Sequence, residues 1–235
     1  MSPGTLYLIP VPLGPGAPQD VLPPHTLSTL QPLRHFVVEN AKSARAFLKI
    51  AGTTLPLQEL QLNELNEHSR PADIAPLLAP LLAGEDVGLL SEAGCPAVAD
   101  PGAALVALAQ QQNIRVVPLI GPSSLLLALM GSGLDGQRFA FHGYLPIDEE
   151  ARKRRIRELE AESARHARTQ LFIETPYRND RMFEALKATC DPETRLCVAR
   201  DLTTADEWIA TRRIADWKKT SAPDLSKRPT VFLLL

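Results

Sequence analysis

Short runs of strand-forming residues alternate with helical runs along the whole chain, and this alternation is the feature that most limits its fold. Several of the strand-type runs are almost continuously apolar, as is typical of parallel strands covered by helices on both faces. The pattern predicts an α/β protein. The expected strands are residues 6–10, 35–38, 87–90, 116–119, 139–142, 170–173, 195–199 and 230–235.

The segments between the expected strands carry signals of helix starts and breaks. Asp100 followed by Pro101 is typical of an N-cap and a first helical position, so we expect a helix to begin there. Residues 72–83 place apolar side chains on one face, but two prolines within this run predict a kinked or broken helix. Thr204 and Glu207 have the spacing of a capping box, which predicts another helix after them.

The length of the chain, 235 residues, suits one large domain or two small ones. Strand-helix alternation restarts near residues 118–122, where Gly and Pro interrupt an apolar run. We therefore expect two small α/β domains, residues 1–118 and residues 119–235. The sheet of the first is expected to be mostly parallel, and the sheet of the second mixed.

The composition excludes several classes of protein. Hydrophobic residues make up 45% and charged residues 22%, which is ordinary for a soluble globular protein. No apolar run approaches the roughly 18 residues of a membrane span, and the apolar start lacks the basic residues and cleavage site of a signal peptide. We expect a cytoplasmic protein. Its formal net charge of −2 argues against a generally basic nucleic-acid binder, while a local basic patch stays compatible with it.

The cysteines indicate neither a disulfide framework nor a metal site. Cys95, Cys190 and Cys197 cannot all pair within one chain. They form no C-x-x-C pattern and no cluster with histidine, so we expect no bound metal.

Four loops that follow expected strands are rich in Gly, Pro, Ser and Asp. They are residues 10–18, 91–102, 121–124 and 174–178. Each alone is more often a structural turn, but in open parallel sheets ligands bind outside the carboxyl ends of the strands. A dinucleotide site is disfavoured because no G-x-G-x-x-G pattern is present. The order and combination of the four loops predict a ligand site.

Five segments carry a resemblance to a known family. They are VGLLSEAGCPAVADPG (87–102), VVPLIGPSSLLLALMGSGL (116–134), FHGYLP (141–146), FIETPYR (172–178) and RDLTTADE (200–207). Together they resemble the tetrapyrrole methylase superfamily, in particular the branch that methylates cytidine 2′-hydroxyls of small-subunit ribosomal RNA. The resemblance covers nearly the whole chain.

This resemblance implies a homodimer whose two-domain subunits bind S-adenosylmethionine in a cleft between the domains. It implies many contacts through backbone amides and carbonyls, which agrees with the small, weakly polar residues of the loops. Cys95 is then a wall of the pocket rather than a nucleophile. By motif position, the implied cofactor contacts are Leu13, Ala93, Gly94, Cys95, Val98, Ser123, Ser124, Ile173 and Leu202.

Methyl transfer to a ribose would need a group that removes the hydroxyl proton. Glu39 and Glu174, each at the end of an expected strand, are the candidate catalytic bases. The alternative for each is a carboxylate that caps a helix or pairs with a neighbouring cation. Phosphates of an RNA would need cations, for which Lys42 and Arg178 are the candidates. A denser basic run at 152–157 is either a nucleic-acid contact or a solvated helix face.

Two departures from the ribosomal RNA branch concern the substrate rather than the cofactor. Residues 38–42 read Val-Glu-Asn-Ala-Lys where those relatives carry Ala-Glu-Asp-Thr-Arg, so only Glu39 is kept. The chain also ends at Leu235, without the C-terminal extension of the full-length ribosomal enzymes, and so resembles a short form. The leading hypothesis is an RNA methyltransferase. The alternatives are a small-molecule methyltransferase of the same fold and a non-catalytic module that binds S-adenosylmethionine and regulates a partner.

Overall fold

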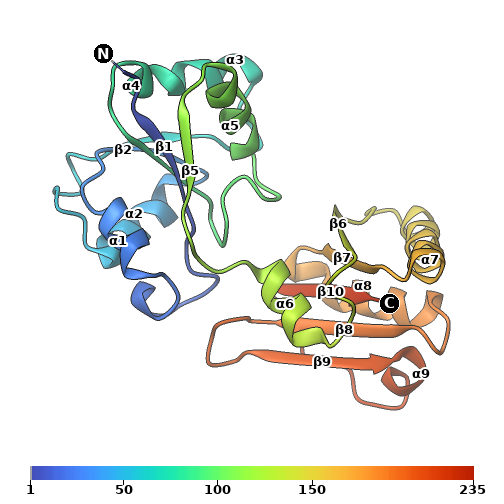
Figure 1. Ribbon diagram of the computed structural model, residues 1–235. Helices are drawn as coiled ribbons and strands as arrows, with labels where there is room; N and C mark the ends of the chain where they lie inside the picture. Colours follow the sequence, from blue (N-terminus) through green and yellow to red (C-terminus); the bar gives the residue numbers. More distant parts are fainter. Residues whose placement is uncertain (1) are drawn as a thin grey trace. The chain divides into compact units, whose positions relative to one another are not determined.

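The computed structural model describes residues 2–235 and separates into two compact units, Met1–Ser123 and Ser124–Leu235. Each unit contains one five-stranded sheet flanked by helices (Figure 1), which confirms the predicted α/β class. Among the described residues, no helix is both long and apolar enough to cross a membrane. The same residues hold no group of three or more His, Cys, Asp or Glu side chains arranged for a metal ion.

The sheet of the first unit is entirely parallel, with strand order β3-β2-β4-β1-β5. All five carboxyl ends therefore lie at one edge, and the loops that follow them meet there. The strands are β1 (Thr5–Ile9), β2 (His35–Val38), β3 (Gln61–Glu64), β4 (Val87–Leu90) and β5 (Arg115–Pro118).

Helices cover both faces of this sheet, and each face has its own core. On one face Phe36 and Ile9 pack with Leu30 and Leu48 of α1 and α2, and on the other Leu89 packs among side chains of α4 and α5. This double burial explains why β2 and β4 read as apolar runs. The helical segments are η1 (Pro18–Asp20), α1 (Pro24–Leu30), α2 (Ala41–Ala51), α3 (Pro71–Ile74), η2 (Ala75–Leu78), α4 (Ala79–Leu82) and α5 (Gly102–Gln111).

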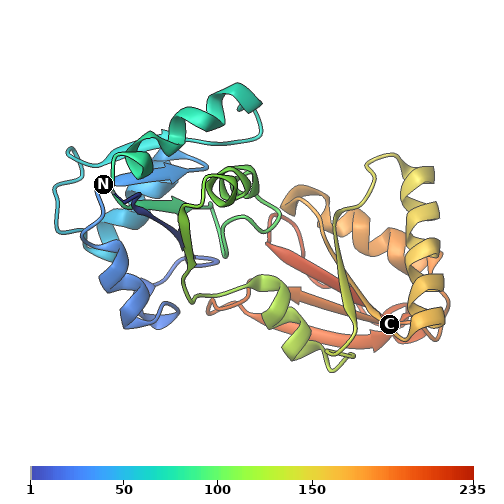
Figure 2. The ribbon, with the colours of Figure 1, turned by 45° about the horizontal axis from the view of Figure 1, so that its top comes forward.

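The sheet of the second unit is mixed, with strand order β6-β7-β10-β8-β9. Strands β6 and β7 are parallel and the other pairs are antiparallel. Helix α6 lies on one face, and α7 and α8 lie on the other (Figure 2). The elements are α6 (Ser124–Ser132), β6 (Phe139–Tyr144), α7 (Glu149–His166), β7 (Thr169–Ile173), η3 (Pro176–Arg178), α8 (Asn179–Thr189), β8 (Arg195–Arg200), β9 (Trp208–Arg213), α9 (Ile214–Trp217) and β10 (Thr230–Leu234).

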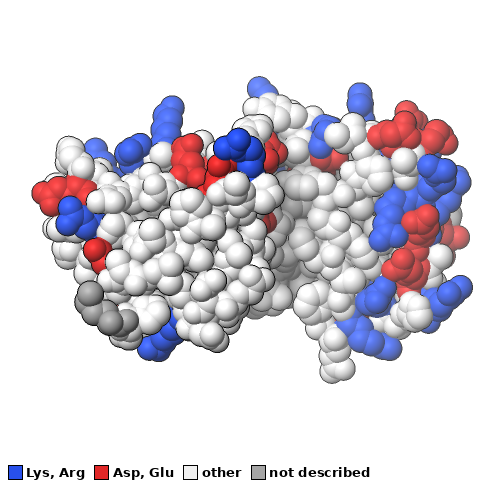
Figure 3. All heavy atoms as spheres, turned by 90° about the horizontal axis from the view of Figure 1, so that it is seen from above, with Lys and Arg blue, Asp and Glu red and all other residues white. Residues whose placement is uncertain are grey.

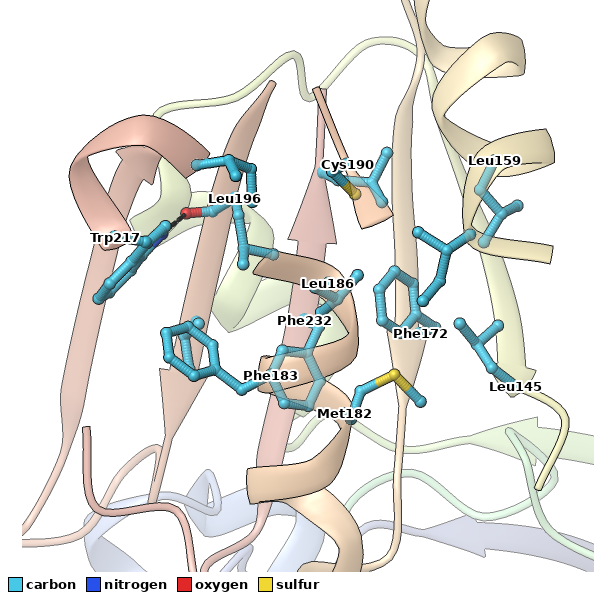
Figure 4. Close-up of a cluster of buried hydrophobic side chains, with 14 of the residues drawn as sticks. Leu145, Leu159, Phe172, Met182, Phe183, Leu186, Cys190, Leu196, Trp217 and Phe232 are labelled. Carbon is cyan, nitrogen blue, oxygen red and sulfur yellow. Dashed lines mark hydrogen bonds between the residues drawn. The ribbon is translucent and has the colours of Figure 1, made fainter. Parts of the chain in front are cut away.

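Four aromatic side chains pack among aliphatic ones in the core beneath α7 and α8 (Figure 4). The rings of Phe172 and Phe232 stack with centroids 5.8 Å apart, and Phe183 meets Trp217 edge-on at 5.3 Å. The indole N–H of Trp217 donates to the carbonyl oxygen of Leu196 at 2.9 Å, so the buried ring has its polar atom satisfied. This core fixes the end of β7, which leads into the fourth candidate loop.

The structure contradicts the capping-box prediction. No helix begins at Thr204; residues 201–207 instead form the turn between β8 and β9, and β9 follows directly. The backbone N–H of Thr203 donates to a carboxylate oxygen of Glu207 at 2.7 Å, and that of Glu207 donates to the carbonyl oxygen of Thr204 at 3.1 Å. Side-chain and main-chain bonds at this spacing close a turn as readily as they start a helix.

Strands β3 and β9 were not expected. Strand β3 reads Gln-Leu-Asn-Glu and is largely exposed at the edge of its sheet, so it has no apolar pattern. The predicted break of residues 72–83 is confirmed, because this run is divided into α3, η2 and α4.

Residues just after 118 stay with the first unit. The backbone N–H of Leu119 donates to the carbonyl oxygen of Leu8 at 2.9 Å, which extends the pairing of β5 with β1. The hydroxyl of Thr26 donates to the carbonyl oxygen of Ile120 at 2.8 Å. These bonds place the third candidate loop beside the first two.

Candidate functional site

Three candidate loops of the first unit are tied together at the carboxyl edge of its sheet. The backbone N–H of Val11 donates to the carbonyl oxygen of Gly94 at 3.0 Å, and that of Gly94 donates to Val11 at 3.1 Å. The thiol of Cys95 lies 3.5 Å from the carbonyl oxygen of Pro122, its hydrogen-bond acceptor. The loops that follow β1, β4 and β5 are therefore held by direct contacts.

Gly94 is required where these loops meet. Its φ of +74° lies in the left-handed region, and a Cβ added there would lie 3.2 Å from Cδ2 of Leu13. Two of the predicted cofactor contacts, Leu13 and Gly94, are thus neighbours. Burial raises the pKa of Cys95, so its thiol stays protonated at neutral pH and suits a pocket wall.

The loop between β4 and α5 has an unusual backbone. Ala97 and Ala99 both adopt left-handed conformations, with φ of 65° and 55°. Non-glycine residues rarely adopt positive φ, and such strain gathers at ligand sites. Val98, between the two alanines, is 49% exposed, so the loop presents an apolar side chain to its surroundings.

The same loop carries main-chain donors that suit a ligand. Within residues 2–235, the backbone N–H groups of Ala93 and Cys95 donate no hydrogen bond, whereas that of Val98 closes a tight turn over residues 96–97. Free amides beside small side chains fit a nucleoside cofactor, because adenine nitrogens and a carboxylate accept such bonds without any large polar side chain. Donors without a partner among the described residues thus occur at two of the predicted contact positions, Ala93 and Cys95.

Glu39 lies at the end of β2, next to this loop. One oxygen of its carboxylate, Oε2, accepts the backbone N–H of Glu92 at 3.1 Å. Burial raises the pKa of Glu39, and the hydrogen bond from the backbone N–H of Glu92 lowers it in part. The negative charges of Asp100, Glu92 and Glu67 raise the pKa further. Glu39 therefore binds a proton more strongly than an exposed glutamate does.

Residues 40–42, which differ from the ribosomal RNA branch, still form a capped start of α2. The side-chain oxygen of Asn40 accepts the backbone N–H groups of Lys42 and Ser43 at 2.9 and 3.2 Å, so Asn40 is the N-cap. The side chain of Lys42 is exposed near Glu39 in the chain. The candidate substrate cation is thus an exposed side chain in the first turn of α2.

Glu174 is engaged within the second unit. Its side chain is only 2% exposed, and one oxygen, Oε1, accepts Nε and Nη2 of Arg178 at 3.0 and 2.7 Å and the backbone N–H of Thr175 at 2.7 Å. Strand alternation points Glu174 to the face of Phe172, whereas Ile173 points to the face of α6. Glu174 and Arg178 thus form the ion pair that sequence reasoning left as the alternative to catalysis.

Leu202 lies in the strained turn after β8. It is buried, and its neighbours Asp201 and Thr203 have φ of 50° and 69°. Nη1 of Arg228 donates to Asp201 at 2.7 Å, and Nδ2 of Asn179 donates to the carbonyl oxygen of Arg228 at 2.6 Å. These bonds connect the Leu202 turn to the start of α8.

The predicted contacts at Ser123 and Ser124 straddle the division of the chain: Ser123 is the last residue of the first unit, and Ser124 begins α6. Both side chains are partly exposed. Backbone N–H groups at the start of a helix favour anionic partners.

The basic run on α7 is mostly committed to contacts within the second unit. Arg152 is buried and donates to the carbonyl oxygen of Ile147 at 2.9 Å. Lys153 and Arg155 pair with glutamates of the same helix. Figure 3 shows cations and anions interleaved over this part of the surface. The arrangement is that of a solvated helix face.

Comparison with known proteins covers almost the entire chain. A sequence model of the tetrapyrrole (corrin/porphyrin) methylases matches residues 6–217. The Pseudomonas aeruginosa protein named ribosomal RNA small subunit methyltransferase I is 31% identical, over 97% of this chain and 77% of that protein. Proteins of the same name from Synechocystis sp. and Xylella fastidiosa are 33% and 32% identical, over 90% and 100% of this chain and 72% and 81% of theirs.

Solved structures agree in fold. A diphthine synthase superimposes with a TM-score of 0.68 at 17% identity, over 98% of this chain and 89% of its own. The methyltransferase CobJ gives a TM-score of 0.64 at 21% identity, over 100% and 94%. Because these sequence identities are low, the similarities show only that the fold is shared.

The ion pair of Glu174 predicts a stability effect. Glu174→Ala would leave the guanidinium of Arg178 and the N–H of Thr175 without their acceptor, and we expect a loss of roughly 2–3 kcal/mol, less than for a fully buried pair because Arg178 is partly exposed. Urea unfolding followed by tryptophan fluorescence measures this, since Trp208 and Trp217 both lie in the second unit.

Glu184→Ala is the matched control, because Glu184 on α8 pairs with Lys187 but its side chain is 60% exposed. We expect little change in this variant. A Glu174→Ala protein as stable as the wild type would contradict a structural role and return Glu174 to the candidate bases.

Proposed function

The chain belongs to the family of tetrapyrrole methylases, and from this premise we propose that it methylates a ribose 2′-hydroxyl of small-subunit ribosomal RNA. As a member, it is a methyltransferase that uses S-adenosylmethionine. The observation that carries the RNA proposal is an identity of 31–33% over at least 90% of the chain with enzymes named for that substrate.

The bound cofactor would supply an electrophilic methyl group on a sulfonium. The free amides of the β4–α5 loop support its placement there, since they offer donors that nothing else among residues 2–235 accepts. The Leu13 side chain, packed against Gly94, would exclude water from the same place. The residues proposed to hold the cofactor are Leu13, Ala93, Gly94, Cys95, Val98, Ser123, Ser124, Ile173 and Leu202.

Glu39 is the proposed base. Its raised pKa makes it a better proton acceptor than an exposed glutamate, while its bond to the backbone of Glu92 fixes its direction. In-line displacement then requires mainly that the hydroxyl and the methyl group be aligned. The RNA backbone would be met by Lys42 and by Arg178, whose Nε and Nη2 already hold Glu174 and so orient Nη1.

A small-molecule acceptor is the second candidate. The interleaved charges of α7 and the net charge of −2 favour it, because neither provides the concentrated positive surface that many RNA-binding proteins carry. Cytoplasmic location and a homodimeric state are also proposed, on family resemblance.

The test of substrate is transfer of labelled methyl from S-adenosylmethionine into fractions of an extract from cells that lack this protein. We expect label in the RNA of the small ribosomal subunit, because only unmodified sites can accept it. Label confined to small molecules would favour the second candidate. Cofactor binding without transfer to any fraction would contradict both and favour a regulatory module.

The proposed base predicts a specific kinetic pattern. Glu39→Gln keeps the acceptor for the N–H of Glu92 but removes the base, so we expect kcat to fall about 100-fold or more while affinity for S-adenosylmethionine stays within about twofold. Because burial raises the pKa of Glu39, wild-type activity should decline with falling pH at a higher pH than for an ordinary glutamate.

Glu92→Gln is the control, since it changes a neighbouring exposed carboxylate without removing the proposed base. It should keep the rate at neutral pH, and its acidic limb should move only slightly, towards lower pH, because loss of the Glu92 charge lowers the pKa of Glu39. A fully active Glu39→Gln variant would exclude Glu39 as the base.

A further inference from the structure

The left-handed alanines of the β4–α5 loop need a partner that holds them. Two non-glycine residues with positive φ, separated by one residue, cost free energy that the surrounding structure must offset. The loop is anchored at Gly94 by its bridge to Val11, but that contact lies before the strained stretch. A second anchor must act at residues 97–99.

Asp100 supplies this anchor. Its Oδ1 accepts the backbone N–H of Ala97 at 3.2 Å and that of Gly102 at 2.6 Å. The bond to Gly102 is the ordinary one of a helix start, but the bond to Ala97 reaches back into the loop and closes it on itself. Burial raises the pKa of Asp100, and the two N–H groups oppose this rise by stabilising the carboxylate.

Gly102 leaves room for the carboxylate. A Cβ at Gly102 would lie 2.6 Å from Oδ1 of Asp100 and 2.9 Å from Cδ2 of Leu89. Leu89 is a buried residue of β4, so it cannot easily move aside. The absence of a side chain at Gly102, the first residue of α5, therefore leaves space for the carboxylate of Asp100.

We propose that Asp100 is a positioning residue for cofactor binding: through Ala97 it locks residues 97–99 in their strained conformation and so directs the free amides of Ala93 and Cys95 at S-adenosylmethionine. The proposal rests on the assignment of this loop to the cofactor. It goes beyond an N-cap, which would stabilise α5 without any effect on ligand affinity.

The experiment measures the affinity for S-adenosylmethionine by calorimetry, together with thermal unfolding, in the full chain. Asp100→Ala removes both bonds, and we expect affinity to fall about 10- to 100-fold, as for loss of hydrogen bonds to a charged group. Asp100→Asn keeps an acceptor oxygen without the charge and should retain an intermediate affinity.

A second variant disturbs the conformation of residues 97–99 directly, without changing Asp100. Ala97→Val keeps Asp100 but places a β-branched residue where φ is positive, so it should weaken binding to a similar extent. Ala104→Val is its control, because Ala104 is exposed on α5 with ordinary helical geometry. This pair keeps the test decisive if Asp100→Ala fails to fold.

The outcomes distinguish the positioning role of Asp100 from the assignment of this loop to the cofactor. Lower melting temperatures with unchanged affinity in Asp100→Ala and Ala97→Val would make Asp100 a structural cap and overturn the proposal, while leaving the cofactor assignment intact. A wild-type protein that fails to bind S-adenosylmethionine would instead overturn the cofactor assignment, and the positioning role with it.

Discussion

The two hydrogen bonds between Val11 and Gly94 join the loop after β1 to the loop after β4, and the candidate site depends on them. They are possible because the sheet of the first unit is entirely parallel, so that β1 and β4, which are neighbours, end at the same edge. The bridge brings Leu13 against Gly94 and leaves the adjoining amides without internal partners. A bound ligand with hydrogen-bond acceptors would satisfy these amides.

Two carboxylates complete the support of the β4–α5 loop. Glu39 holds the N–H of Glu92 near its beginning, and Asp100 holds the N–H groups of Ala97 and Gly102 near its end. Burial raises the pKa of both groups, so each is kept close to the loop at some cost in stability. That cost is reasonable where a rigid loop lowers the entropy lost on binding a cofactor.

Much of the fold could be predicted because strands that are buried on both faces consist of apolar residues. Strands β2 and β4 are buried on both faces and read as apolar runs, whereas the exposed edge strand β3 has no such pattern. The loops of the candidate site are predicted from their Gly and Pro content and from resemblance. The Val11–Gly94 bridge could not be predicted from the sequence, because main-chain hydrogen bonds between distant loops require no particular side chain at Val11. Nor could the sequence tell whether Glu174 was free or held by Arg178, since both possibilities need the same residues.

The central claim is that the amides of the β4–α5 loop hold S-adenosylmethionine, and backbone hydrogen exchange with and without the cofactor tests it most directly. We expect exchange at Ala93 and Cys95 to slow on addition of saturating cofactor, since their N–H groups would gain acceptors. Unchanged exchange throughout residues 91–102, with binding verified on the same sample, would contradict the account.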